Sequence, residues 1–531
     1  MSKKETRRVA KEQKKVEKAD REIRFNRASF WQLALFPFHS MSHNSFMFLM
    51  SIVSYYAAGI VGLGTVIASF VITGSRILDG VTDPIIAYFY DKTKGKYGKI
   101  RPFTVLAYVT MTVSVLLIYF TTHLLPDNLQ LIYFIAMYFV FIIGYTFSGI
   151  SNAANFAVIS NDPKQRPVLG GLQMIATMFF YTAATVYLSM YLTPKYGGFE
   201  NPALFQEFTV TTIIFAGIGY GLFIIAIWTK DRPENFNTGV ATSPLKFKDL
   251  WPVLKGNRPL QMYIVAATTD KLGLQIAGNA IISVMLFGII FGNYALAGLL
   301  SSMALLPNIL MILFGTAIAR KFGLKKGLVL STWGCIITYV LMFLLLWLGD
   351  PTQIRMENMG LMTIAFIVLY IGSGALRYVT NAVTPPMLAD IVDYESYKSG
   401  RFLPGMVGGI YQFIDKSVSA LAQTFVGLAL AAIGFKAAFP DVNTPFTQTI
   451  FWMTMFLFIG TKLIAWISTL VAMKFYELDK ERMDEIQGEL EDRRRKVKVQ
   501  AESDRQEKVK EGIILGERGD VANVSSANRY L

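Results

Sequence analysis

Long blocks of apolar residues are the feature of this sequence that most limits its fold. Many of the blocks reach 18 residues, which is about the length that an α-helix needs to cross the hydrocarbon core of a bilayer. Hydrophobic residues make up 53% of the 531 residues and charged residues only 17%, whereas about 25% of residues are charged in ordinary globular domains. The pattern predicts an all-α membrane protein and excludes an ordinary soluble enzyme.

We predict twelve transmembrane helices, with six on each side of a polar stretch at 230–259. The predicted spans are 30–60, 64–90, 102–122, 129–158, 168–193 and 207–229, then 260–291, 293–319, 327–348, 360–388, 405–433 and 448–472. This order divides the chain into a basic N-terminal tail (1–29), an N-terminal six-helix bundle (30–229), a middle loop (230–259), a C-terminal six-helix bundle (260–472) and a charged C-terminal tail (473–531).

The positions of the basic residues predict the orientation of these spans. Most of the 51 Lys and Arg residues fall in the two tails and in the turns after even-numbered spans, while the other turns carry only Lys195, Arg355 and Lys436. Because cytoplasmic loops are rich in Lys and Arg, we expect both termini in the cytoplasm of a multi-pass cell-membrane protein. The net charge of +14 is then a sign of topology, and no nucleic-acid partner is expected.

The sequence gives no sign of catalysis, of a cofactor or of ATP as an energy source. It has no glycine-rich phosphate loop followed by Lys and Ser or Thr, so ATP is not expected to drive the protein. His39 and His43 lie four residues apart on one face of the first span, but no acidic residue or Cys accompanies them. We therefore predict no catalytic residue and no bound metal beyond a coupling ion, Na⁺ or H⁺.

The second span carries the clearest cluster of charges inside the membrane, Arg76, Asp79 and Asp83 in the sequence RILDGVTDP. An ionisable residue at this depth costs about 2.5–3.5 kcal/mol unless it has a partner or a water-filled cavity. Spacings of three and four residues place all three side chains on one face of a helix. Two carboxylates beside one Arg leave one negative charge, which suits Na⁺ or a shared proton.

Polar groups on two later spans are further candidates. Lys416 follows Asp415 in the sequence, but adjacent helical residues point about 100° apart. Lys416 is therefore expected to face the carboxylates of the second span. Gln275 and Asn279 continue a polar stripe on the seventh span, which either binds solute hydroxyls or joins helices by hydrogen bonds.

Two more charges inside the membrane have no neighbour in the sequence. Arg377 and Lys462 each stand alone on their spans, and we expect a structural role for both.

The two halves of the chain follow the same plan. Each has six spans, and each has a basic turn after its second span, at Asp91–Arg101 and at Arg320–Lys326. Two six-helix halves joined by a cytoplasmic loop are the plan of the major facilitator superfamily, whose substrate sites lie between the halves. A channel or a membrane-bound enzyme with twelve spans is the alternative at this point.

Two motifs make the resemblance more specific. The stretch Arg76–Pro102, RILDGVTDPIIAYFYDKTKGKYGKIRP, resembles the signature of the glycoside–pentoside–hexuronide:cation symporter family within that superfamily. The residues that match are Arg76, Asp79, Asp83, Pro84, Asp91, Thr93, Gly98, Lys99, Arg101 and Pro102. The stretch Ala389–Arg401 is similar to a second family motif after span 10, although it is one residue short before Arg401.

The resemblance implies roles for particular residues. In the family the two acids of span 2 hold the coupling cation, and they match Asp79 and Asp83. A Tyr-Thr pair on span 4 matches Tyr145 and Thr146, with the Thr directed to the cation and the Tyr to the sugar. The family's span-11 Lys, which links the two sites, matches Lys416.

Residues at the cytoplasmic rim, and one polar residue of span 2, complete the expected site. By resemblance, Asp91, Lys99 and Arg101 belong to a charged inner gate that closes against the other half. The candidate partners for this gate are Asp390 and Asp393. Thr82, directly before Asp83, is expected to tune the choice of cation, with Arg76 in a supporting role.

The family's sugar-binding residues are mostly replaced. The positions of its span-4 acid and of an aromatic residue fall on Gly149 and Ala153, its span-1 Lys-Asp pair on Ser42-His43, its span-5 Arg on Met174 and its span-10 Trp on Asn381. A melibiose-like disaccharide is therefore not expected. The resemblance implies a monomeric symporter for another glycoside, a pentoside, a hexuronide or a different small metabolite, with Asn381 kept as a solute-binding candidate.

Two other functions remain open from the sequence. The same fold carries amphiphiles such as lysolipids in distant relatives, and it can also serve as a membrane sensor that transports nothing. Both tails are expected to be solvated.

Overall fold

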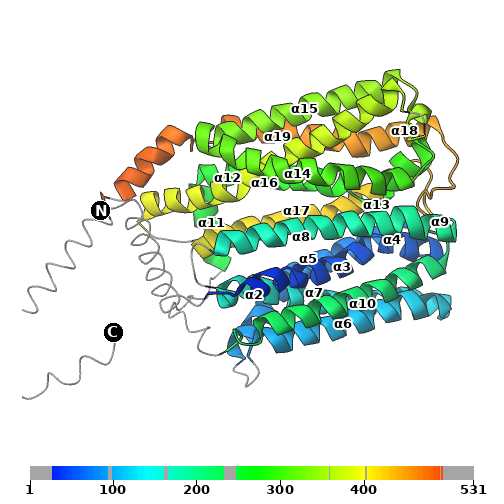
Figure 1. The fold of residues 1–531 in the computed structure, drawn as a ribbon, viewed down its shortest axis with the longest axis horizontal. Coiled ribbons are helices and arrows are strands. Elements are labelled where there is room, and N and C mark those ends of the chain that lie inside the picture. Colours follow the sequence, from blue (N-terminus) through cyan, green and yellow to red (C-terminus); the bar gives the residue numbers. More distant parts are fainter. Residues whose placement is uncertain are drawn as a thin grey trace, which may run out of the picture.

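The computed structural model describes residues 27–93, 98–160, 165–232, 247–357, 359–400, 404–490 and 492–493. Helices make up this part of the chain, and no strand occurs in it. The long helices run roughly parallel to one another, and the first and last described segments lie at the same end of the bundle (Figure 1).

The first half of the chain forms the helices between Phe30 and Ile227. They are α2 (Phe30–Leu35), α3 (Phe38–Ser51), α4 (Val53–Tyr55), η1 (Tyr56–Ile60), α5 (Thr65–Lys92), α6 (Ile100–Thr121), η2 (Thr122–Leu124), α7 (Asp127–Ile159), α8 (Arg166–Val186), η3 (Tyr187–Leu192), α9 (Thr193–Tyr196) and α10 (Pro202–Ile227).

The second half begins after α11 (Phe247–Gly256). Its helices are α12 (Arg258–Ala277), α13 (Ala280–Ser283), η5 (Val284–Ile290), α14 (Ala295–Phe322), α15 (Leu324–Leu348), η6 (Pro351–Gln353), α16 (Leu361–Ser399), α17 (Pro404–Ala432), α18 (Gln448–Met455), η7 (Phe456–Gly460) and α19 (Thr461–Lys474).

Helix boundaries follow local sequence signals. Asn201 caps α10 by accepting a hydrogen bond from the backbone N–H of Ala203 at 3.0 Å, and Pro202 occupies the first helical position, where no backbone donor is needed. Gly64, with φ of 74°, supplies the left-handed backbone that precedes α5. Such signals set the residue at which a helix begins. The starting residue in turn determines which side chains of that helix face inward.

Nine helices in the described part are long and apolar enough to cross a membrane. A tenth span results if α12 is joined to the helix that follows it, across a 52° bend. The predicted first span is broken into α2, α3, α4 and η1, each shorter than 18 residues, and α5 carries Arg76, Asp79 and Asp83 within it. A multi-pass membrane protein follows, whereas the count of twelve and the sidedness stay predictions.

Helices pack mainly within their own half of the chain. In the first half α6 packs on α7 and α3 on α10; in the second half α15 and α14 pack on α16, and α12 packs on α19 and α17. Within the described residues the main contacts between the halves are those of α5 with α17 and of α14 with α8 and its continuation η3. The seam between the halves is therefore formed mainly by α5 and α17 on one side and by α8, η3 and α14 on the other.

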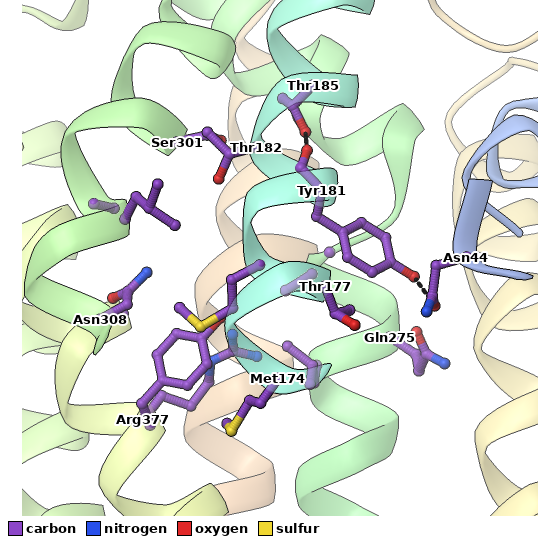
Figure 2. A pocket seen from close by; sticks show the side chains of 18 of the residues that line it. Asn44, Met174, Thr177, Tyr181, Thr182, Thr185, Gln275, Ser301, Asn308 and Arg377 are labelled. Carbon is purple, nitrogen blue, oxygen red and sulfur yellow. Dashed lines mark hydrogen bonds between the residues drawn. The ribbon is translucent and has the colours of Figure 1, made fainter. Parts of the chain in front are cut away.

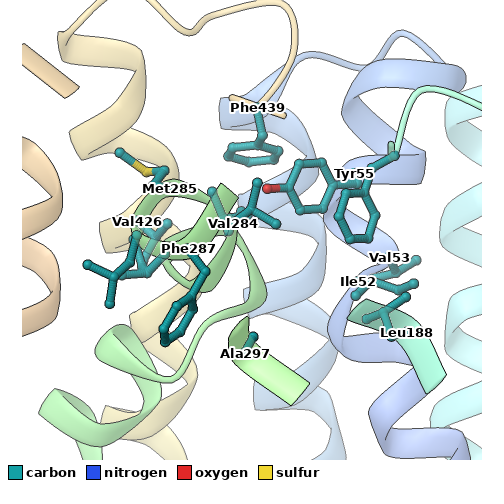
Figure 3. Close-up of a cluster of buried hydrophobic side chains, with 14 of the residues drawn as sticks. Ile52, Val53, Tyr55, Leu188, Val284, Met285, Phe287, Ala297, Val426 and Phe439 are labelled. Carbon is teal, nitrogen blue, oxygen red and sulfur yellow. The ribbon is translucent and has the colours of Figure 1, made fainter. Parts of the chain in front are cut away.

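The apolar core is continuous between the halves only toward one end. The largest cluster joins Tyr55 and Leu188 of the first half to Val284, Val426 and Phe439 of the second (Figure 3). Two smaller clusters are each confined to one half. The halves are thus fused at the end away from the described termini.

Hydrogen bonds reinforce this fused end, which we call the closed end and define by Tyr55, Thr65, Phe199 and the loop 435–443. The backbone N–H of Thr65 donates to the carbonyl of Lys436 at 2.9 Å, and the Tyr55 hydroxyl donates to the carbonyl of Pro440 at 2.9 Å. The ring of Tyr55 also stacks on Phe199, with centroids 4.5 Å apart.

The start of the C-terminal tail corrects one expectation. Residues 480–490 are helical, and Leu478, Met483, Ile486 and Leu490 are buried in the second half's own cluster. This segment is packed rather than solvated because its apolar side chains cover the ends of the second-half helices. Residues 1–26 of the N-terminal tail lie outside the described residues.

Candidate functional site

An acidic cluster lies where α5 of the first half meets α17 of the second. The ammonium group of Lys416 forms an ion pair with Asp83 and lies 3.4 Å from Oδ2 of Asp79. The side chains of Lys416 and Asp83 are 39% and 36% exposed, so water and ions can reach them. The structure therefore brings the two acids of one half together with the Lys of the other.

Two threonines extend this cluster toward α7. The hydroxyl of Thr146 donates to Oδ1 of Asp79 at 2.8 Å, and it lies 3.2 Å from the hydroxyl of Thr82. Thr82 also donates to the backbone carbonyl of Asp79 at 3.1 Å. Hydroxyl and carboxylate oxygens from α5 and α7 thus converge at one point, which is the chemistry that a hard cation such as Na⁺ requires.

These groups line a cavity of about 600 Å³ between the halves. Its walls include Arg76, Asp79, Asp83, Tyr145, Thr146, Gly149, Gln275 and Lys416. Gly149 occupies the position of the span-4 acid in the symporter family described above. A Cβ added to it would meet no atom within 4 Å. The cavity therefore has open space where the sugar-binding carboxylate of that family would stand.

A second cavity, of about 970 Å³, lies between α8 of the first half and α14 and α16 of the second. Much of its lining is polar: Ser40, Asn44, Thr177, Tyr181, Gln275, Ser301 and Asn308. The hydroxyl of Tyr181 donates to Oδ1 of Asn44 at 3.0 Å (Figure 2). We call this space the central cavity.

One wall of the central cavity carries two cations that sequence reasoning treated as isolated. Arg377 of α16 and Lys462 of α19 both line it, and Figure 2 shows Arg377 on the same side as Asn308. Lys462 donates a hydrogen bond to the Tyr339 hydroxyl. The two residues are far apart in the sequence, so only the packing of α16 and α19 against α15 could reveal the pair.

The two cavities share part of their walls. His43 and Gln275 line both of them. The ring of His43 stacks on Tyr145 with centroids 4.2 Å apart, and its Nδ1 lies 2.9 Å from the hydroxyl of Ser148. His43 therefore separates the acidic cluster from the central cavity.

Gln275 and Asn279, the polar residues predicted on span 7 either to bind solute or to join helices, have different roles. Gln275 faces the cavities. Asn279 instead donates to Oε1 of Gln423 at 2.7 Å and caps α13 at the bend after α12, which is an interhelical and structural role. Lys271 pairs with Asp415. The side chain of Asn381 lies outside the described residues.

Residues 38–480 match the family model described as MFS/sugar transport protein. The chain belongs to this family. The resemblance to glycoside–pentoside–hexuronide:cation symporters, and membership of the major facilitator superfamily, are thereby confirmed.

Individual relatives agree with the assignment to this transporter family. The proposed glycoside/cation symporter YagG of Escherichia coli (strain K12) is 24% identical over 83% of this chain and 90% of its own. The isoprimeverose transporter of Lactiplantibacillus pentosus is 22% identical over 82% and 86%. The crystal structure of the nucleoside transporter NupG matches with a TM-score of 0.56 and 12% identity, over 85% of this chain and all of that one, which shows the fold alone.

The transporter holds part of its expected inner gate within one half. Asp231, which sequence reasoning missed, accepts hydrogen bonds from the backbone N–H groups of Lys99 and Arg101, both at 2.9 Å. The guanidinium of Arg101 bonds to the same carboxylate at 3.2 Å. Asp231 thus ties the start of α6 to the end of α10.

The other gate candidates are placed differently. Asp393 accepts a hydrogen bond from Gln487 of the tail helix at 2.7 Å, while Asp390 lies on the same face three residues before it. The side chain of Asp91 lies outside the described residues. Because this structure is fused at the opposite end, a gate that pairs across the halves at this end stays a prediction for another conformation.

Proposed function

We propose that this protein is a secondary transporter that couples a sugar-like solute to Na⁺ or H⁺ by symport. The observation that carries the proposal is the placement of Asp79 and Asp83 against Lys416 across the seam between the halves. The family match and the glycoside/cation symporter among the relatives support the same function.

Charge balance supports a cation site at this cluster. Arg76 and Lys416 together neutralise Asp79 and Asp83, and all four line one cavity. A Na⁺ ion or a proton at the two acids competes with the Lys416 ammonium for the same oxygens. Arrival of the cation therefore weakens a contact between the halves, which is the change that coupling requires.

The arrangement of the halves supports alternating access. They are fused at the closed end, and each keeps a separate apolar cluster at the other end. We infer that the central cavity faces the cytoplasm here and that rocking of the two halves opens it to the other side. In this proposal both termini are cytoplasmic and the carrier works as a monomer in the cell membrane.

The position of the solute follows from the two cavities. The central cavity is large enough for a sugar, since ligand sites commonly measure about 300–1,000 Å³, and it holds about 970 Å³. Its hydroxyl and amide groups suit sugar hydroxyls. His43 and Gln275 line both cavities, so a change at the cation site can alter their contacts with the solute.

Replacing one acid tests the cation site directly. In Asp83→Cys the Lys416 ammonium loses one partner and the cation loses a ligand, so cation-driven uptake should disappear while the protein still inserts into membranes. Uptake into proteoliposomes with and without a Na⁺ or H⁺ gradient measures this. Full cation-driven accumulation in the variant would rule out the assignment. Absence of any solute flux in the unaltered protein would instead favour a sensor.

One observation favours a second candidate, the transport of an amphiphile. An apolar groove of about 520 Å³ lies between α8, η3 and α14, and it shares Thr182 and Leu305 with the central cavity. An acyl chain could lie in such a sideways opening. The polar lining and the two cations of the central cavity argue against a wholly apolar cargo.

A further inference from the structure

The central cavity has an uneven charge. Arg377 and Lys462 line it, and no Asp or Glu occurs among its lining residues in the described part of the chain. Both cations come from the second half, while the facing wall on α8 and α3 is neutral and rich in hydroxyl and amide groups. A solute in this space therefore meets positive charge on one side only.

Asp270 of α12, which interacts electrostatically with both cations, does not form an ion pair with either of them. The Asp270 carboxylate accepts a hydrogen bond from the indole N–H of Trp466 at 2.8 Å, and no ion pair within 4.0 Å involves Arg377 or Lys462 among the described residues. Lys462 lies over the rings of Tyr339 and Phe458, at 4.7 and 5.2 Å. These contacts position the ammonium without neutralising it.

The other charges inside the bundle are balanced. Lys271 pairs with Asp415, and Lys416 and Arg76 together match the two acids of α5 in one cavity. In the part of the chain that the structure describes, Asp270 is the acid that remains for Arg377 and Lys462, which leaves one positive charge in excess on this wall. An unneutralised charge within a membrane protein is expensive and commonly marks a substrate pathway.

We propose that the solute is a sugar acid whose single oxyanion, a carboxylate or a sulfonate, binds between Arg377 and Lys462. This deepens the proposed function and rests on it. The guanidinium of Arg377 offers a planar pair of donors that matches a carboxylate, and Lys462 supplies a point charge beside it. Thr177, Tyr181 and Asn44 on the facing wall then bind the sugar hydroxyls (Figure 2).

The sugar acid also fits the proposed coupling. A cation at Asp79 and Asp83 adds one positive charge to a cluster that is neutral without it. An anionic solute carries one negative charge, so the pair crosses the membrane with no net charge added to the bundle. A neutral sugar would leave both the coupling ion and the cations of the cavity wall uncompensated.

A matched set of ligands separates the acid from the sugar. Thermal unfolding of the purified protein is measured with glucuronate, galacturonate and their β-methyl glycosides, with sulfoglucose (6-deoxy-6-sulfoglucose), and with the uncharged amide or parent hexose of each, in Na⁺ and in K⁺. A ligand that binds only the folded state raises the unfolding temperature, and the shift grows with the logarithm of the ligand concentration above its dissociation constant. We expect one or more acids to do so, with its neutral counterpart at least about tenfold weaker, since hydrogen bonds to charged groups are worth that much.

Variants of the wall test the assignment of residues. Arg377→Gln and Lys462→Gln should each raise the acid concentration needed for a given shift by at least about tenfold, and Arg377→Lys should restore part of the affinity. Arg355→Gln removes a charge from a loop outside the cavity, where the side chain donates to the carbonyl of Thr352, and should change nothing. Unfolding temperatures without ligand show whether each variant is folded.

The outcomes distinguish this proposal from the one it rests on. Neutral sugars that bind as well as the acids, an acid whose binding is unchanged in both Gln variants, or no shift with any acid would overturn the sugar acid. So would stabilisation by lysophosphatidate alone, which would indicate a lipid headgroup as the source of the oxyanion. Cation-driven uptake of a neutral sugar would keep symport and reject the acid. Acid binding and uptake that depend on Arg377 but not on Na⁺ or H⁺ would keep the acid and reject cation coupling.

Discussion

Lys416 of α17 forms an ion pair with Asp83 of α5, so the two halves of the transporter are joined by opposite charges as well as by apolar packing. Both side chains remain partly exposed to the cavity. A bound cation can replace the Lys416 ammonium at the carboxylate of Asp83. The apolar contacts of the closed end offer no such exchange. The predictions below treat the charged contact and the closed end separately.

Lys416→Gln should strengthen cation binding and weaken coupling. Without the ammonium, Asp79 and Asp83 lose a competitor for the cation, and the Na⁺ or H⁺ concentration at half-saturation should fall by about tenfold, or ~1.4 kcal/mol. Solute accumulation should fall because the contact between the halves no longer responds to the ion. Isothermal titration and proteoliposome uptake measure the two effects. Lys195→Gln, which removes the partner of Glu207 outside this cavity, should leave the cation midpoint unchanged.

Thr146→Val should weaken the cation site without unfolding the protein. The hydroxyl of Thr146 donates to Asp79 at 2.8 Å, and a hydrogen bond to a charged group is worth about 1.5–3 kcal/mol. The cation concentration at half-maximal uptake should shift by about tenfold or more. Thr146→Ser keeps the hydroxyl and should behave like the unaltered protein. Equal effects of Val and Ser would mean that side-chain shape, not the hydrogen bond, matters here.

Asp231→Ala should destabilise the fold more than any other single change at the start of α6. The buried carboxylate accepts hydrogen bonds from three backbone N–H groups, those of Lys99, Ile100 and Arg101, and pairs with the Arg101 side chain. A backbone donor that loses its buried partner costs about 1–3 kcal/mol, so we expect a loss of about 3 kcal/mol in total.

The space around Asp231 gives a second variant for this prediction. A Cβ at Gly98 would lie 2.3 Å from the Asp231 carboxylate, so Gly98→Ala should also lower the unfolding temperature. Asp231→Asn keeps one acceptor oxygen and should fall between Asp and Ala. Thermal unfolding that ranks Asn below Ala would contradict this account.

Asp441 at the closed end should make stability depend on pH. It accepts a hydrogen bond from the backbone N–H of Phe199 at 3.1 Å, while its Oδ2 is buried without a partner among the described residues. Burial, with a further contribution from Glu200, raises the pKa of the Asp441 carboxyl above its usual range. The titratable groups nearby are Glu200, Tyr55 and Tyr294.

The sign of this dependence follows from the direction of the shift. A raised carboxyl pKa means that the closed end binds a proton more readily than the unfolded chain, so this contact is most favourable at pH below the ordinary carboxyl pKa. It weakens as the pH rises through the raised value. Asp441→Asn should therefore raise the unfolding temperature at neutral pH and flatten its pH profile. Asp350→Asn should not raise the unfolding temperature, because a hydrogen bond from the Thr352 hydroxyl lowers the pKa of the Asp350 carboxyl.

Part of the site could be predicted because it lies within one helix. Spacings of three and four residues place Arg76, Asp79 and Asp83 on one face of a helix, and α5 carries them as an unbroken helix. Thr146 entered through resemblance alone, whereas Lys416 was also expected to face these acids because it points about 100° away from Asp415. Their contact with those acids depends on how α7 and α17 pack against α5, which no local pattern encodes.

Other groups were missed for a related reason. Arg377 and Lys462 each stand alone on a helix, so the sequence indicates only that each is expensive to bury. Their position on one wall arises because α16 and α19 both pack around α15. Asp231 lies in a short polar segment that resembles many others, and its role as the cap of α6 appears only when the ends of α10 and α6 meet.

The sequence by itself determined that this is a helical, multi-pass membrane transporter of a recognisable family, because membrane spans and helix faces depend on composition and on spacing within about 20 residues. Only the tertiary structure decided which charges are neutralised and which remain open to the cavity. Ion pairing falls off over a few ångströms, and residues more than 300 positions apart, such as Asp83 and Lys416, reach that distance only when the two halves pack together.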